Sequence, residues 1–213
     1  MNLPNKLTVL RICLIPLFLF FMIVPLPGAY GEVIARCIAA ALFVGTAITD
    51  YWDGHLARKY GLITDFGKFL DPLADKMMVL GAMIGLIVLS MDEAVSTFGG
   101  VFVRMLALSA FVVLFRELAV TSLRLAASGS SGVVIAANKL GKVKTVTQIV
   151  FVMVCLLEPV VFGVIFPLIW QGFAYVSEFK VLTYASMAVM LTMTVWSGLA
   201  YFKAYFPIIN SNK

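Results

Sequence analysis

The chain has 213 residues, of which 62% are hydrophobic and only 13% are charged, and its mean hydropathy is +1.03. These values exclude an ordinary soluble domain and predict an integral membrane protein. Because a helix needs ~20 apolar residues to cross a bilayer, the chain has room for about six spans and no separate soluble domain. We therefore expect one all-α membrane domain over residues 1–213. The formal net charge of +5 favours cytoplasmic loops and anionic phosphate partners over nucleic acid.

Six apolar windows follow one another along the chain, and each is long enough for one membrane span. Their approximate bounds are 8–25, 33–57, 69–89, 101–127, 143–170 and 181–206. Positive residues stay on the cytoplasmic side of a membrane, and thirteen of the sixteen basic residues fall at one end of these spans. Both termini are therefore predicted to be cytoplasmic. The compact length and the lack of a transit segment before Leu3 favour a bacterial inner membrane.

The segment between the second and third windows carries aspartates in an apolar background. At ~3.6 residues per turn, Asp50 and Asp53 share one helix face, and Asp71 and Asp75 share a face of the next helix. Residues 59–66, with Asp65 as the predicted N-cap, turn the chain back so that the two faces meet. With a rise of ~1.5 Å per residue, both pairs lie within roughly 15 Å of this turn. We therefore expect four carboxylates at a common level just inside the cytoplasmic surface.

Four carboxylates in a poor dielectric repel one another unless cations compensate them. Hard oxygen ligands favour Mg²⁺ or Mn²⁺, and a two-metal site suits phosphoryl chemistry. On the same faces, Gly54, Ala57 and Gly67 offer surface for an anionic substrate with a flat base, and Arg58 offers a bidentate phosphate clamp. In the alternative interpretation, the aspartates are solvated loop residues, or they pair with basic neighbours and hold two helix ends together; these neighbours are Arg58, Lys59, Lys68 and Lys76.

The pattern Asp50-x2-Asp53-Gly54-x2-Ala57-Arg58-x8-Gly67-x3-Asp71-x3-Asp75 matches every fixed position in the signature of the CDP-alcohol phosphotransferase family. The resemblance implies a six-helix membrane enzyme, usually a homodimer, whose active site opens to the cytoplasm. Such enzymes join a CDP-linked group to an alcohol, release CMP and depend on Mg²⁺ or Mn²⁺. It also implies roles for the four aspartates: all are metal ligands, and Asp75 is in addition the general base.

Finer features resemble one branch of this family, which transfers the phosphatidyl group of CDP-diacylglycerol to sn-glycerol 3-phosphate. They are the segments 3–11, 69–76, 116–117 and 141–145, so the similarity covers about two-thirds of the chain. The implied products are phosphatidylglycerol phosphate and CMP. The closest alternative is another branch, such as a cardiolipin, phosphatidylserine or phosphatidylinositol phosphate synthase. A divalent-cation transporter is a more distant alternative, since it needs carboxylates near the midplane and access from both sides.

Polar residues near the cytoplasmic surface complete the predicted substrate sites. Asn5 and Thr8, with Arg11 at the same helical spacing, are candidates to bind the nucleotide phosphates of CDP-diacylglycerol; helix initiation and interfacial snorkelling are the alternative. The candidates for the phosphate of glycerol 3-phosphate are basic, and a positive-inside role competes with this assignment; they are Arg11, Arg116, Lys142 and Lys144. Because Arg116 follows a long apolar run and precedes Glu117, we expect a buried cation there to need a partner.

A GxxxG motif in the third window, Gly81 and Gly85, predicts close helix packing or dimerisation.

Overall fold

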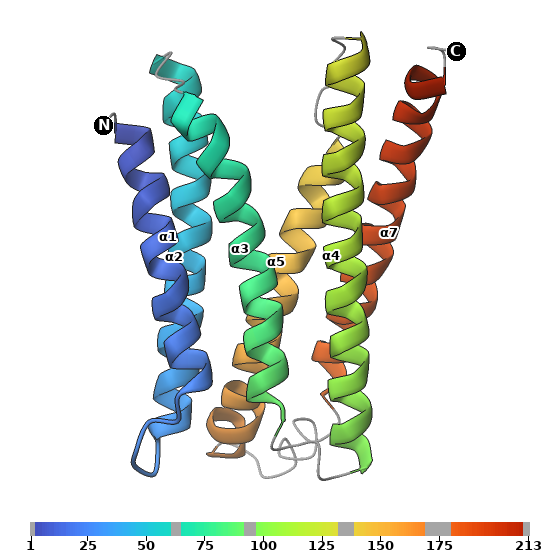
Figure 1. Ribbon diagram of the computed structural model, residues 1–213. Helices are drawn as coiled ribbons and strands as arrows, with labels where there is room; N and C mark the ends of the chain where they lie inside the picture. The colour runs from blue at the N-terminus through green and yellow to red at the C-terminus, as the bar shows by residue number, and fades with distance from the viewer. Residues whose placement is uncertain (1–2, 61–64, 92–96, 132–138, 169–179, 211–213) are drawn as a thin grey trace.

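The computed structural model describes residues 3–60, 65–91, 97–131, 139–168 and 180–210 (Figure 1). Six long helices run up and down the molecule: α1 (Leu3–Ile23), α2 (Gly31–Tyr60), α3 (Asp65–Leu89), α4 (Thr97–Ser131), α5 (Lys139–Val160) and α7 (Val181–Asn210). A π-helical turn, η2 (Val161–Ile165), and a 3-10 turn, η3 (Phe166–Leu168), follow α5. The described residues contain no strand, so the predicted all-α class is confirmed.

Five of the long helices contain a stretch that is long and apolar enough to cross a membrane: Asn5–Ile23, Gly31–Asp50, Leu70–Leu89, Leu140–Ile165 and Val181–Phe206. The remaining long helix, α4, lies beside α3 and α7. Large apolar side chains are exposed on the outside of the bundle, including Leu108, Phe115 and Leu199. Exposing so much apolar surface to water is unfavourable, whereas lipid tails accommodate it. This surface agrees with an integral membrane protein.

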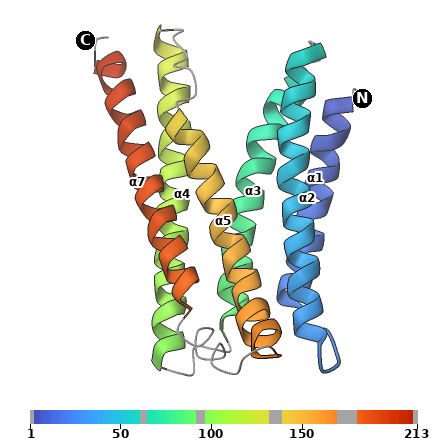
Figure 2. The same ribbon diagram turned by 180° about the vertical axis from the view of Figure 1, so that it is seen from behind.

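The helices form two groups of three. In the first group α1 packs against both α2 and α3, and in the second α7 packs against both α4 and α5. Contacts of α3 with α4 and of α5 with α2 and α3 join the two groups. Figures 1 and 2 show that the groups diverge towards the end where both chain termini lie. The end of α2, the start of α3 and the start of α5 face this same end, which we call the terminal end.

One hydrophobic core cluster contains residues of both groups. Phe18 and Phe43 are fully buried, and their rings meet edge to face at 5.6 Å between centroids. Phe151 and Leu156 of α5 belong to the same cluster. A smaller cluster at α4 and α7 contains the stacked rings of Tyr201 and Tyr205. In this smaller cluster the two tyrosine rings of α7 pack together with the aliphatic side chains of Val120 and Ala127 on α4.

The GxxxG motif brings α3 close to α1 within this chain. A Cβ atom on Gly85 would lie 3.0 Å from the Leu19 Cδ2 and Met22 Cε atoms, and one on Gly81 would lie 3.4 Å from Leu19 Cδ1. The absence of side chains allows the two helices to approach. The prediction of close packing is therefore confirmed, and α1 occupies this face.

Candidate active site

Helix α1 connects the two helices that carry the predicted metal ligands. The Arg11 guanidinium, whose side chain is fully buried, forms an ion pair with Asp50 of α2 at 2.5 Å between Nη1 and Oδ1. One turn earlier, the Thr8 hydroxyl donates a hydrogen bond of 2.9 Å to Oδ1 of Asp71 on α3. Thr8 and Arg11 therefore fix one carboxylate on each neighbouring helix. Asn5, a further turn towards the terminal end, is also buried.

Asp75 lies where the two helix groups face each other. Its carboxylate interacts electrostatically with Asp50 of α2, with Glu117 of α4 and with Lys144 of α5. Asp75 is half-buried and Asp71 is exposed. The structure therefore brings three of the four predicted carboxylate positions to one region, since Thr8 and Arg11, one turn apart on α1, contact Asp71 and Asp50.

Part of the signature lies where the structure gives the backbone alone. Between residues 51 and 69 it describes the surroundings of Trp52 and Gly67 only, and Gly67 is buried in the first turns of α3. Asp53, Gly54, Ala57 and Arg58 fall in the last turns of α2, and their side-chain roles lie outside the described residues. Among the described side chains, which do not include that of Asp53, no three potential ligands form a metal-binding group.

A buried charge cluster on α4 and α5 faces the carboxylates. Glu117 accepts hydrogen bonds from the Lys144 ammonium and, at 3.1 Å, from Nη1 of Arg116. The three side chains are between 4% and 13% exposed. Lys142, which is on the same helix as Lys144, is exposed. The expectation that a buried Arg116 needs a partner is confirmed, because Glu117 binds it.

Helix α7 contacts this cluster through Tyr201 and Gly198, which lie against Arg116. The Arg116 guanidinium lies over the Tyr201 ring at 5.5 Å from the centroid, which is a cation–π contact. Close approach is possible because a Cβ atom on Gly198 would lie 3.2 Å from Cγ of Arg116. Gly141 allows a similar approach of α5 to the Tyr201 hydroxyl, also at 3.2 Å. The two glycines thus let α4, α5 and α7 converge on Arg116 and Tyr201.

Sequence reasoning missed two buried polar residues of this region. The sequence gives Glu117 only as the neighbour of Arg116, whereas in the structure Glu117 of α4 also binds Lys144 of α5. Gln148 is 2% exposed, and its Nε2 and Oε1 atoms have no hydrogen-bond partner among the described residues. A glutamine inside an apolar helical run is itself a signal of function, and it lies four residues after Lys144.

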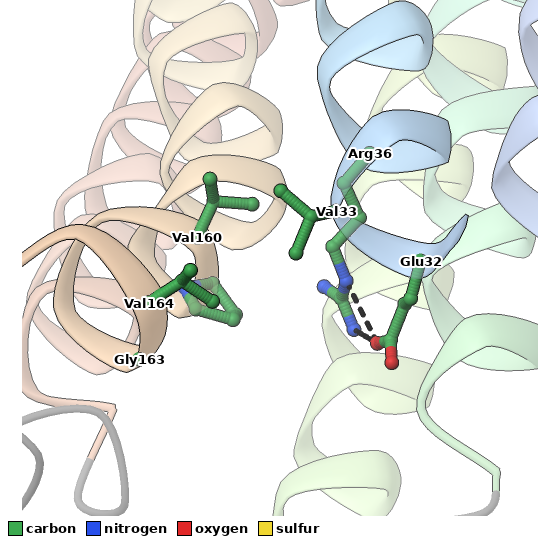
Figure 3. Close-up of a pocket in the computed structure, with 7 residues that line it drawn as sticks. Glu32, Val33, Arg36, Val160, Gly163 and Val164 are labelled. Carbon is green, nitrogen blue, oxygen red and sulfur yellow. Dashed lines mark hydrogen bonds and ion pairs between the residues drawn. The ribbon is translucent and has the colours of Figure 1, made fainter. Parts of the chain in front are cut away.

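A separate cavity of about 190 Å³ lies at the opposite end of the bundle, between the start of α2 and the end of α5 (Figure 3). Arg36 and Glu32 line it together with Val160 and Val164, and the Arg36 guanidinium binds Glu32 at 2.8 and 3.0 Å. With a rise of ~1.5 Å per residue, Arg36 is ~21 Å along α2 from Asp50. This cavity is therefore distinct from the carboxylate region.

Known proteins match this chain along most of its length. The profile of the CDP-alcohol phosphatidyltransferase family matches residues 1–196. A CDP-diacylglycerol–glycerol-3-phosphate 3-phosphatidyltransferase of Bacillus subtilis (strain 168) is 42% identical over 170 residues, which cover 77% of this chain and 81% of that protein. The enzyme of the same name from Pseudomonas fluorescens is 32% identical over 214 residues, covering 100% of this chain and 94% of its own. The enzyme of the same name from Rickettsia typhi (strain ATCC VR-144 / Wilmington) is 30% identical over 206 residues, which cover 95% of this chain and 96% of that protein.

Proposed function

Because the chain belongs to the CDP-alcohol phosphatidyltransferase family, we propose that it transfers the phosphatidyl group of CDP-diacylglycerol to sn-glycerol 3-phosphate. The products are phosphatidylglycerol phosphate and CMP. One observation carries the choice of an anionic acceptor: Lys144, buried and bound to Glu117, interacts electrostatically with Asp75. A cation beside the reacting carboxylate suits an acceptor that carries a phosphate. The names of the bacterial relatives support the same reaction.

The same proposal assigns two divalent cations, Mg²⁺ or Mn²⁺, to the carboxylates of the signature, namely Asp50, Asp53, Asp71 and Asp75. Carboxylate oxygens are the ligands that these ions prefer. The described contacts fit such a site, because Thr8 and Arg11 orient the Asp71 and Asp50 carboxylates from the side, as outer hydrogen-bond partners of metal ligands do. When bound, the cations neutralise the pyrophosphate and the developing charge on the leaving group.

In the proposed reaction, Asp75 acts as the general base. It takes the proton from the primary hydroxyl of glycerol 3-phosphate as the oxygen attacks the phosphorus that bears diacylglycerol. The new oxygen–phosphorus bond forms while the bond from this phosphorus to the bridging oxygen breaks, and CMP leaves with that electron pair. The residues that we assign to the binding of CDP-diacylglycerol are Asn5, Thr8, Gly54, Ala57, Arg58 and Gly67.

Basic residues hold the acceptor in this scheme. Lys144 and Arg116 meet at Glu117, and we assign the acceptor phosphate to them, with Lys142 at the exposed rim. Arg11 is assigned here as well, although its ion pair with Asp50 also makes it an anchor for that carboxylate. Glu117 keeps the two buried cations together at a fixed place, which reduces the entropy that binding costs.

The proposed location is a bacterial inner membrane with both termini in the cytoplasm. Both termini lie at the same end of the bundle (Figure 1), and the predicted positive end contains most basic residues of the chain. The relatives named above are bacterial. Membrane lipids are the surroundings, and we expect a homodimer, as the family resemblance implies. Its interface excludes the Gly81 and Gly85 face, which α1 covers.

The test is CMP release from CDP-diacylglycerol by detergent-purified protein with Mg²⁺ or Mn²⁺. Glycerol 3-phosphate, serine, inositol phosphate and phosphatidylglycerol are offered separately, and Asp75→Asn is assayed beside a matched carboxylate variant at the opposite end, Glu32→Gln. We expect release with glycerol 3-phosphate alone, loss of release in Asp75→Asn and on chelation, and no loss in Glu32→Gln. Turnover with another acceptor would move the chain to another branch, whereas no release with any acceptor would return the carboxylates to binding or transport.

A further inference from the structure

The Gln148 side chain has an unsatisfied amide inside the bundle. It is 2% exposed, and neither its amide nitrogen nor its amide oxygen has a hydrogen-bond partner among the described residues. A buried carboxamide without partners is costly, most of all in a membrane protein, where water does not reach the interior freely. Other buried hydroxyls solve this problem locally: Thr46 and Ser197 donate to backbone carbonyls of their own helices. Gln148 has no such solution, which points to a ligand as its partner.

The position of Gln148 defines where that ligand lies. Gln148 follows Lys144 by four residues on α5, so both side chains are on the same helix face, with Gln148 ~6 Å further along the axis. Because α5 starts at the terminal end (Figures 1 and 2), Gln148 is the deeper of the two. Lys144 in turn binds Glu117 and interacts electrostatically with Asp75. The unsatisfied amide is thus one helical turn below the proposed phosphate site.

We infer that the Gln148 carboxamide binds the secondary hydroxyl of glycerol 3-phosphate. This inference rests on the proposed function. With the acceptor phosphate at Lys144 and the primary hydroxyl directed to Asp75, the secondary hydroxyl is the polar group left between them. A carboxamide can both donate to and accept from a hydroxyl, and it adds no charge beside the carboxylates. The residue therefore selects an acceptor that carries a hydroxyl next to the reacting one.

The experiment compares two acceptors that differ by this hydroxyl alone. Glycerol 3-phosphate has it, whereas 3-hydroxypropyl phosphate keeps the phosphate and the primary hydroxyl and lacks it. A site that is built to bind a hydroxyl strongly rejects an analogue without it, because the polar group of the protein is then left unpaired. For the wild-type protein we expect kcat/KM for CMP release to be at least about 10-fold higher with glycerol 3-phosphate.

The matching variant is Gln148→Met, which keeps the side-chain length and removes the amide. We expect it to lose about 10-fold in kcat/KM with glycerol 3-phosphate and almost nothing with 3-hydroxypropyl phosphate, so that the preference disappears. Ser109→Ala is the control, because this buried hydroxyl bonds to the Met105 carbonyl of its own helix; it should keep the wild-type preference. Unfolding of each variant in detergent is measured in parallel.

Three outcomes would overturn the inference. One is equal use of both acceptors by the wild-type protein, a result that needs no variant. The second is an equal loss on both acceptors in Gln148→Met, which would make Gln148 a packing residue. The third is unchanged kinetics in that variant. If folded wild-type protein releases no CMP with either acceptor, the proposed function itself has failed, and this result is distinct from the other three.

Discussion

The buried charge cluster on α4 and α5 gives a stability prediction that the structure makes quantitative. Glu117 lies between two cations, and the side chains of Lys144, Arg116 and Glu117 are 4%, 10% and 13% exposed. Glu117→Gln leaves both cations buried without the negative charge between them. Removing one partner of a buried ion pair costs ~3–5 kcal/mol, chiefly because a charge remains uncompensated. Since an amide oxygen can still accept from Lys144, we expect a loss of about 3 kcal/mol in the free energy of unfolding.

The assay is a double-mutant cycle. The free energies of unfolding of the wild-type protein, Glu117→Gln, Lys144→Met and the double variant are measured in detergent micelles by denaturant titration. The double variant removes both charges of the pair, so we expect it to lose less than the sum of the single losses, by ~1–3 kcal/mol. Arg104→Gln is the control, because this cation is exposed on the same helix and its replacement should change stability by less than ~0.5 kcal/mol.

Two results would refute this reasoning. Unfolding of Glu117→Gln within ~0.5 kcal/mol of the wild-type protein would mean that the cluster is solvated rather than buried. Additive losses in the cycle would mean that Glu117 and Lys144 do not interact, whatever their distance.

Two further predictions concern the contacts of α1. Thr8→Val removes the donor to Asp71, and because outer hydrogen bonds orient metal ligands, we expect the Mn²⁺ concentration for half-maximal CMP release to rise at least about 10-fold; an unchanged metal titration would contradict this role. Gly85→Leu forces a side chain against Leu19 and Met22 and should lower the free energy of unfolding by ~1–3 kcal/mol through overpacking. Gly45→Leu is the matched control, since a Cβ atom there meets nothing within 4 Å, and equal losses in both variants would argue against close contact of α1 and α3.

The sequence alone determined the helices and the segment that carries the signature. An apolar run in a bilayer has to satisfy its backbone hydrogen bonds internally, and each predicted window is helical over most of its described length. The window 33–57 lies within α2 (Gly31–Tyr60), and the predicted N-cap Asp65 is the first residue of α3. Fixed spacing also put Asp71 and Asp75 on one face of α3, because helical periodicity converts a separation in sequence into a direction around the helix axis.

Only the tertiary structure decided which side chains meet across helices. The tilt and rotation of each helix are set by packing against its neighbours and do not follow from its own sequence. The ion pair of Arg11 with Asp50 and the bond of Thr8 to Asp71 depend on α1 lying between α2 and α3. The pairing of Lys144 with Glu117 and the unpaired amide of Gln148 depend in the same way on how α5 is rotated towards the interior of the bundle. Helical periodicity determines which residues share one face of a helix. Packing alone determines which residues of the neighbouring helices that face contacts.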